Sequence, residues 1–227
     1  MNCLDIDLQK AGLGKRIAAW MLDAILLCAL AVGCGYCLSA ILDYDGYTQT
    51  LEDGYAYYED QYDITFDIDQ QAYDAMTEQE RKNYEAAFQA LVSDEKVMNA
   101  YNIVINLSLI IATLGILVAM LVLEFVVPLL FGNGATVGKK VFTLGLIRTD
   151  GVKINTMQLF VRTFLGKFTI ETMIPIYLIL MMFWGIMDMT GTLILCGMGI
   201  AQIVIYKVTR TNSQIHDLFA GTAVVDV

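Results

Sequence analysis

Two acidic residues lie within long apolar stretches of the sequence, where a charge is costly. Asp23 is the only charged residue of the stretch 17–42, and Glu124 is the only charged residue of the stretch 103–131. Ionisable side chains in such surroundings carry protons or contact ions in membrane proteins. We therefore take Asp23 and Glu124 as candidates for handling a proton or a monovalent cation.

The two carboxylates have matching positions in their stretches. Asp23 lies seven residues after Arg16, and Glu124 lies seven residues before Phe131. On antiparallel helices this offset puts both about 10 Å below the same surface, so we expect them to face each other and share a proton or a cation. Pro128 has no N–H for the Glu124 carbonyl, which predicts an oxygen-rich niche. A proline kink with a glutamate that reaches the surface is the alternative.

Three further ionisable residues lie at the edges of apolar stretches. Arg16 and Asp23 share a helix face but stand about 10 Å apart along its axis, so each needs another partner. Glu171 suits the N-terminus of a helix, and Asp188 falls in a turn. We assign both of these acids to structure.

The composition places the chain in a lipid bilayer. Its 227 residues are 57% hydrophobic and 17% charged, with a mean hydropathy of +0.57, which is too apolar for an ordinary soluble domain. Of 24 acids, 15 fall between Asp43 and Lys96, so the net charge of −10 is local. No basic stretch offers a nucleic-acid site. The single histidine, His216, has no cluster of metal ligands around it, so we expect neither a cofactor nor an enzyme.

The hydropathy pattern predicts an all-α integral membrane protein with four transmembrane helices. The first two spans cover 17–42 and 103–131, and a helical hairpin covers 173–187 and 192–206. One long tilted helix is the alternative to the hairpin, but four spans put the flanking lysines and arginines on one side. We therefore expect a multi-pass protein of the plasma membrane with both termini in the cytoplasm.

The cytoplasmic side should carry small elements of its own. Apolar residues at helical spacing predict an amphipathic helix over 155–168, lying in the membrane interface. The dipeptide Asp150-Gly151 predicts a β-hairpin between 141–149 and 152–154. The β-prone end of the chain, 222–227, should pair with this hairpin.

The segment 43–101 is an acidic, extracytoplasmic insertion in a single membrane domain that spans 1–227. It holds nine of the twelve tyrosines. Thr77 and Glu80 fit a capping box, which predicts a helix over 78–92 with Tyr84, Phe88 and Leu91 on its apolar face. We expect this face to pack on the region 55–58 or on another protein.

Three separated motifs resemble the RDD family of small membrane proteins, named for an arginine and two aspartates. The segment 14–23 resembles its opening helix, with Arg16 and Asp23 as the arginine and first aspartate. The segment 134–146 is similar to its glycine-lysine motif around Lys139, with a longer spacing before Gly145. The segment 215–222 is similar to its closing motif and supplies Asp217 as the second aspartate. The resemblance implies a multi-pass membrane protein, often suspected of transport.

Two functions are compatible with these features. In the first, Asp23 and Glu124 move a monovalent cation or small solute with proton coupling, while Arg16 and Asp217 form a cytoplasmic gate. His216 and Lys139 are secondary candidates, and four short spans favour a homo-oligomer. In the second, the protein is a scaffold that binds a protein partner through its extracytoplasmic segment. Burial of Asp23 and Glu124 along a wet cavity would favour transport.

Overall fold

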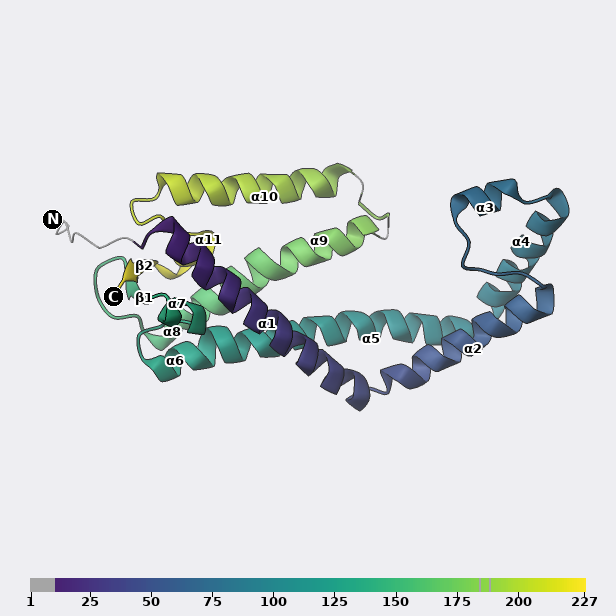
Figure 1. Cartoon of the computed structure of the whole chain (residues 1–227), viewed down its shortest axis with the longest axis horizontal. Coiled ribbons are helices and arrows are strands. Elements are labelled where there is room, and N and C mark those ends of the chain that lie inside the picture. The colour runs from purple at the N-terminus through teal and green to yellow at the C-terminus, as the bar shows by residue number, and fades with distance from the viewer. Residues whose placement is uncertain (1–10, 184, 188) are drawn as a thin grey trace. The chain divides into compact units, whose positions relative to one another are not determined.

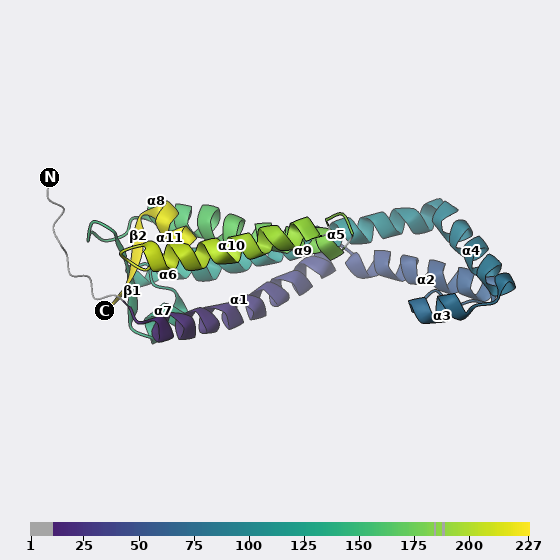
Figure 2. The ribbon, with the colours of Figure 1, turned by 90° about the horizontal axis from the view of Figure 1, so that it is seen from above.

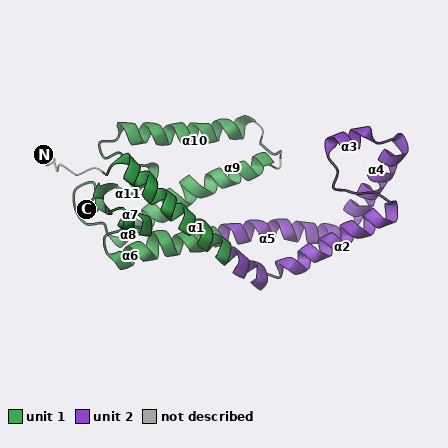
Figure 3. Cartoon of the chain, viewed as in Figure 1, with its two compact units in different colours: residues 1–34, 115–227 green, residues 35–114 purple. Residues whose placement is uncertain are grey.

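The computed structural model describes residues 11–183, 185–187 and 189–227. These residues form two compact units, which are coloured separately in Figure 3. Unit 1 comprises residues 1–34 and 115–227, and unit 2 comprises residues 35–114. Two long helices, α1 and α5, run from one unit into the other.

Four helical segments of the described residues are long and apolar enough to cross a membrane (Figure 1). The first is α1 (Leu13–Ile41), and the second is continuous through α5 (Glu95–Met120), η1 (Leu121–Val126) and α6 (Val127–Phe131). The third runs through α8 (Thr156–Phe160), η2 (Val161–Met173) and α9 (Ile174–Phe183), and the fourth is α10 (Met189–Val208). The predicted all-α membrane fold with four spans is therefore confirmed.

The third and fourth spans form the predicted hairpin, because α9 ends at Phe183 and packs against α10. Figure 1 shows these two helices as neighbours, and in Figure 2 α10 lies in front of α9. Gly185 has a positive φ of 68° between them, a backbone conformation that glycine adopts without steric cost. Asp188, which the sequence places in this turn, lies outside the described residues.

The predicted interfacial helix over 155–168 is not a separate element. It begins as expected, since Asn155 and Gln158 form a reciprocal capping box, but it continues without a break to Phe183. No glycine cap or proline stops the helix before Pro175, and the amphipathic residues become the first half of the third span. The sequence pattern correctly identified the polar face but misjudged where the helix ends.

Both prolines of the chain follow π-helical segments. η1 precedes Pro128 and η2 precedes Pro175, and each segment closes with an N–H that bonds a carbonyl five residues back. A proline in a helix removes one hydrogen bond and crowds the preceding turn, and a wider turn relieves both effects. The two spans that carry prolines therefore remain continuous.

A two-stranded antiparallel sheet closes the same end of unit 1 as α7 (Val137–Val141) and α11 (Ile215–Ala220). Its strands are β1 (Leu144–Arg148) and β2 (Thr222–Asp226), with Leu146 opposite Val224. The predicted pairing of the chain's end with 141–149 is thus confirmed, but the hairpin arm 152–154 is wrong as a strand. The turn itself is present, since the Arg148 N–H donates to the Val152 carbonyl, but the arm makes only one bridge in the described residues, between Ile147 and Lys153. The N–H of Leu146, one residue before Ile147 in β1, donates to the Asn133 carbonyl instead.

Unit 2 contains α2 (Tyr44–Tyr62), α3 (Gln70–Ala75) and α4 (Glu78–Ser93). The capping box of Thr77 and Glu80 is present, and α4 matches the predicted helix over 78–92 to within one residue. The α4 face packs on α2 through the buried Ala87 and Leu91.

An aromatic cluster extends this packing. The ring of Tyr84 meets those of Phe66 and Tyr73 edge to face, and Phe66 meets Tyr55 in the same way. Phe88, predicted to pack beside Tyr84, is instead 46% exposed. The packed face of α4 is therefore rotated towards Ala87, whose small side chain lets the two helices approach closely.

Candidate functional site

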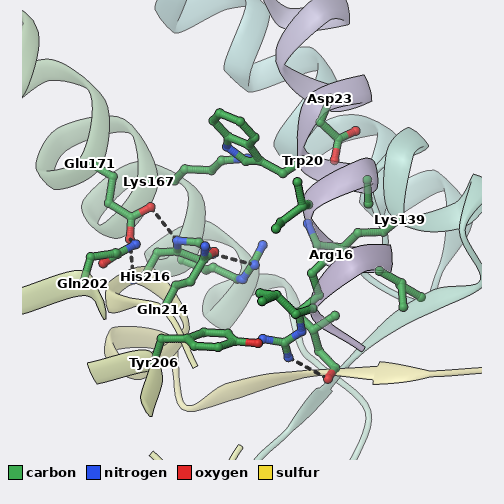
Figure 4. Close-up of a pocket in the computed structure, with 16 residues that line it drawn as sticks. Arg16, Trp20, Asp23, Lys139, Lys167, Glu171, Gln202, Tyr206, Gln214 and His216 are labelled. Carbon is green, nitrogen blue, oxygen red and sulfur yellow. Dashed lines mark hydrogen bonds and ion pairs between the residues drawn. The ribbon is translucent and has the colours of Figure 1, made fainter. Parts of the chain in front are cut away.

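A cavity of about 430 Å³ lies within unit 1 and is shown in Figure 4. Three of the four spans line it, together with α7, α11 and β2. Its polar lining consists of four cations, two acids, a histidine, two glutamines and a tyrosine: Arg16, Lys139, Arg162, Lys167, Asp23, Glu171, His216, Gln202, Gln214 and Tyr206. Such a density of charge inside a membrane domain identifies this cavity as the candidate functional site.

Asp23 is held by the beginning of α7. Its carboxylate accepts hydrogen bonds from the Thr136 hydroxyl at 2.5 Å and from the Gly138 N–H at 2.7 Å. A Cβ on Gly138 would lie 2.2 Å from the Ala19 carbonyl oxygen, so only glycine lets α7 approach α1 this closely. Asp23 therefore joins the first span to the segment that carries Lys139.

Glu124 is buried in η1 and forms an ion pair with Lys167. Its backbone carbonyl accepts a hydrogen bond from the Thr163 hydroxyl at 2.9 Å. The predicted oxygen-rich niche is therefore partly closed, because the carbonyl that Pro128 leaves free has a side-chain donor. The second carboxylate oxygen, Oε2, is buried and has no hydrogen-bond partner among the described residues.

The structure gives Asp23 and Glu124 separate partners instead of the shared proton or cation that the sequence predicts. Lys139 lies near both, since the negative charges of Glu124 and Asp23 act on its ammonium group. Its ammonium group donates a hydrogen bond to the Thr136 hydroxyl, at 3.4 Å. Burial, followed by repulsion from Arg162, lowers the pKa of Lys139 to about 8. Lys139 is thus a cation on which the charges of both acids act, although neither acid pairs with it directly.

Arg16 anchors the end of the chain to the first span. Its guanidinium donates to the backbone carbonyls of Asn212 and Val224 and lies 5.8 Å from the centre of the Tyr206 ring. Arg16 and Asp217 therefore have different direct partners, and their role as a cytoplasmic gate stays a prediction. The charge of Asp217 attracts Arg16 without direct contact, because the guanidinium that pairs with Asp217 is that of Arg162.

Arg162 and Asp217 form a fully buried ion pair, with Nε of Arg162 2.9 Å from Oδ1 of Asp217. Arg162 also donates to Nε2 of His216 at 2.8 Å. Burial alone would raise the pKa of Asp217, but the charge and the hydrogen bond of Arg162 hold it well below its ordinary value. The pair is therefore charged at neutral pH and fixes α11 against η2.

His216 connects this pair to Glu171. Its Nδ1 lies 2.7 Å from one Glu171 oxygen, and its backbone N–H donates to the other at 3.1 Å. Because Arg162 donates to Nε2, the proton of the neutral imidazole sits on Nδ1 and points to Glu171. Burial lowers the pKa of His216, and Arg162 acts in the same direction. A Cβ on Gly166 would lie 2.6 Å from the His216 Cα, so this contact also depends on a glycine.

The sequence identified Arg16, Asp23, Lys139 and His216, all of which line the cavity. It missed two of the partners that complete the site. Glu171 was attributed to helix capping, although it lies in the middle of a continuous helix and binds His216. For Arg162 the sequence pattern predicts a position on the polar face of an interfacial helix. The available signal is the spacing of Arg162, Lys167 and Glu171, which puts all three on one polar face of a helix. The predicted helix ends at 168, however, and so leaves Glu171 out.

Four apolar helices and a charged cavity define a multi-pass membrane protein. The model of the RDD family matches residues 10–221, which is most of the chain, and the chain therefore belongs to this family. A comparison with curated proteins and with solved structures gives no match. The three residues that the family name refers to, assigned from the sequence as Arg16, Asp23 and Asp217, all lie in unit 1.

Proposed function

We propose that this membrane protein binds a small solute in the cavity of unit 1 and moves it across the plasma membrane together with a proton. The observation that carries the proposal is the lining of the cavity: Arg16 and Asp23 from α1, Arg162 to Glu171 from the third span, and Gln202 from α10. Helices that move relative to one another during transport would each contribute ligands to one site. No enzymatic step is proposed.

The geometry supports a small solute better than a bare monovalent cation. The carboxylates first expected to hold a cation are engaged, Asp23 by two donors and Glu124 by the ammonium of Lys167. A cation at Glu124 would have to displace a lysine that is tied to the protein. The 430 Å³ of the cavity are also far more than a single dehydrated ion occupies.

Proton exchange is best supported at Glu171 and His216. The two side chains share a hydrogen bond of 2.7 Å on the cavity wall, and the imidazole is the group whose ordinary pKa lies nearest to neutrality. Proton uptake there would leave the Arg162–Asp217 pair intact, because Arg162 keeps its two contacts with Asp217. The role first predicted for Asp23 and Glu124 thus moves to this neighbouring pair.

The basic residues of unit 1 support an orientation with both termini in the cytoplasm. Lysines and arginines flank the spans at the end that carries α7, α11 and the sheet, which is the pattern of a cytoplasmic face (Figure 1). Large apolar side chains on the spans, such as Ile25, Val32 and Ile200, are exposed and suit contact with lipid. Some of this surface would also serve contacts in a homo-oligomer.

A scaffold function remains the second proposal, and it is supported by unit 2. Tyr57 and Phe88 are exposed there, and Phe88 borders an open groove of about 530 Å³ with Ile68, Tyr73 and Tyr84. Exposed aromatic side chains around a groove are common at protein interfaces. An extracytoplasmic partner protein would bind at this groove without any movement of solute.

Flux in proteoliposomes tests the transport proposal. Vesicles that contain a trapped pH dye would receive pulses of K⁺, Na⁺, succinate or glycerol 3-phosphate. We expect an internal pH change with at least one probe, loss of that change in Glu171→Gln, and no loss in Glu78→Gln, whose carboxylate is exposed on α4. The absence of a pH change with every probe would refute proton-coupled transport of these solute classes and favour the scaffold.

A further inference from the structure

Every carboxylate oxygen of the two acids on the cavity wall already accepts at least one hydrogen bond from the protein. Both oxygens of Asp23 are bonded, one to the Thr136 hydroxyl and one to the Gly138 N–H. Both oxygens of Glu171 are bonded as well, to Gln202 and to His216. A ligand with a positive charge or donor hydrogens would therefore compete at both acids with donors that the protein already supplies.

Two cations of the cavity wall, by contrast, have unused hydrogen-bond donors and no ion pair. Lys139 has three ammonium hydrogens and one long hydrogen bond, and no carboxylate of the described residues lies within 4 Å of its nitrogen. Arg16 likewise has no carboxylate within that distance in the described part of the chain. It binds backbone carbonyls, and its Nε has no partner. Two full positive charges therefore face the cavity without an ion pair.

Lys139 is also close to other cations. Arg162 and Lys167 both repel its charge, and all three side chains line the cavity. An anion beside Lys139 would relieve this repulsion and fill its unused donor positions at the same time. The surplus of donors and of positive charge at one point of the wall therefore indicates an anionic ligand.

The remaining donors favour a phosphate group over a carboxylate. The planar guanidinium of Arg162, which would suit a carboxylate, is already occupied by Asp217 and His216. The ammonium of Lys139 is left as a point donor, and the ammonium of Lys167, which also pairs with Glu124, lies on the same wall. Ammonium groups suit the several oxygens of a phosphate. Next to them, Leu13, Ile17 and Trp20 supply an apolar wall that can contact the organic part of a phosphate ester.

We propose that the cavity of unit 1 binds a phosphate ester, with the phosphate on the ammonium of Lys139 and the organic part against Leu13, Ile17 and Trp20. This inference rests on the solute site of the proposed function and names the class of that solute. Leu13, Ile17 and Trp20 are about half exposed, so the ester can be free in solution or be the headgroup of a lipid. Both sources share the same chemistry.

Fluorescence of Trp20 tests binding without any need for transport. The chain has two tryptophans, so a Trp184→Phe background leaves Trp20, on the cavity wall, as the reporter. The protein would be titrated in maltoside micelles free of phosphate with glycerol 3-phosphate, with short-chain phosphatidylglycerol, and with succinate as a non-phosphate anion. We expect a saturable emission change with one or both phosphate probes and a weaker response to succinate.

Lys139→Gln should weaken the binding of the phosphate probe at least about tenfold, because it removes a charge-assisted hydrogen bond. The matched control is Lys140→Gln, since Lys140 lies over the Phe131 ring, 3.7 Å from its centre, and does not line the cavity. Thermal unfolding of both variants would verify that they are folded. A response to glycerol 3-phosphate supports a soluble ester, and a response to phosphatidylglycerol alone supports a headgroup.

Three results would overturn the inference: no saturable response to either phosphate probe, succinate binding as tight as phosphate binding, or equal affinities in Lys139→Gln and Lys140→Gln. Flux remains a separate measurement. Binding without a pH change in vesicles would refute transport but keep the phosphate site. A pH change driven by K⁺ or Na⁺, with no phosphate binding in micelles, would refute the phosphate site but keep transport.

Discussion

The guanidinium of Arg162 lies 2.9 Å from the carboxylate of Asp217, and both side chains are at most 2% exposed. This pair joins the third span to α11, so the aspartate near the end of the chain is an anchor for a helix that carries His216. The carboxylate of Asp217 supports the wall of the cavity from behind and does not line it.

Removal of one partner from this pair should destabilise the protein strongly. Asp217→Asn or Arg162→Leu leaves a buried charge without its counterion, which costs about 3–5 kcal/mol. We expect a clear fall in the midpoint of thermal unfolding in detergent. Lys82→Ala, which removes an exposed ion pair with Glu78, is the control and should leave the midpoint unchanged. Equal midpoints for all three variants would contradict an anchoring role.

Gly138→Ala should disrupt the contact between α1 and α7. The added methyl group would meet the Ala19 carbonyl oxygen at 2.2 Å and the Asp23 carboxylate at 2.9 Å, so the helices must separate. Gly33→Ala in α1 has nothing within 4 Å of the new atom and should be neutral or slightly stabilising. Thermal unfolding compares the two variants, and similar midpoints would show that Asp23 is not held as described.

The affinity for a phosphate ester should fall as the pH rises through about 8. Burial and Arg162 lower the pKa of Lys139 to about 8, so the empty cavity loses this charge above that pH. Below it, Lys139 is protonated and the attraction is fully present. In Lys139→Arg, which stays charged, binding should persist to a pH of about 9.5. Parallel pH profiles of Trp20 fluorescence for wild type and Lys139→Arg would argue against Lys139 as the phosphate ligand.

The capping box of α4 should contribute measurably to unit 2. Thr77 bonds the backbone N–H of Glu80, and its removal in Thr77→Ala should cost about 1 kcal/mol. Hydrogen exchange over 78–92 should become faster, whereas Thr65→Ala, in the exposed loop before α3, should not change it. Unprotected amides over 78–92 in the wild type would refute a folded α4.

Cysteine labelling of intact cells tests the topology. In a background without the natural cysteines, a membrane-impermeant reagent should modify a cysteine at Tyr57 or Thr190 and spare one at Val227. All three positions are exposed in the structure. Modification at Val227 would place the end of the chain outside and contradict the proposed orientation.

Hydropathy and motif spacing predicted the spans, the pairing of β1 with β2, and α4, because each of these depends on local pattern. The partners of the buried charges depend on tertiary contacts instead. Arg162 and Asp217 are 55 residues apart, and Glu171 and His216 are 45 apart, so no local spacing indicates either pair. Glu124 was recognised from its apolar surroundings, but its counterion Lys167 comes from another span.

The error over 155–168 had a different cause. An amphipathic pattern describes which residues face a polar environment, and the sequence cannot tell an interface from an internal cavity. Arg162 and Lys167 were assigned to the interface, yet they face the cavity. Because the predicted helix ends at 168, Glu171 falls at the start of the next predicted span, where an acid suits the helix N-terminus. The prediction therefore contains no contact between Glu171 and His216.

Chemical blocking of the cavity during flux tests the central claim most directly. In a cysteine-free background, Ile17→Cys lies on the cavity wall, and Ile25→Cys, on the same helix, is exposed but does not line it. Both variants would be treated with a methanethiosulfonate reagent in proteoliposomes and tested with K⁺, Na⁺, succinate and glycerol 3-phosphate. We expect the pH change to be lost in Ile17→Cys and kept in Ile25→Cys. Complete modification of Ile17→Cys with an unchanged pH change would contradict passage of the solute through this cavity.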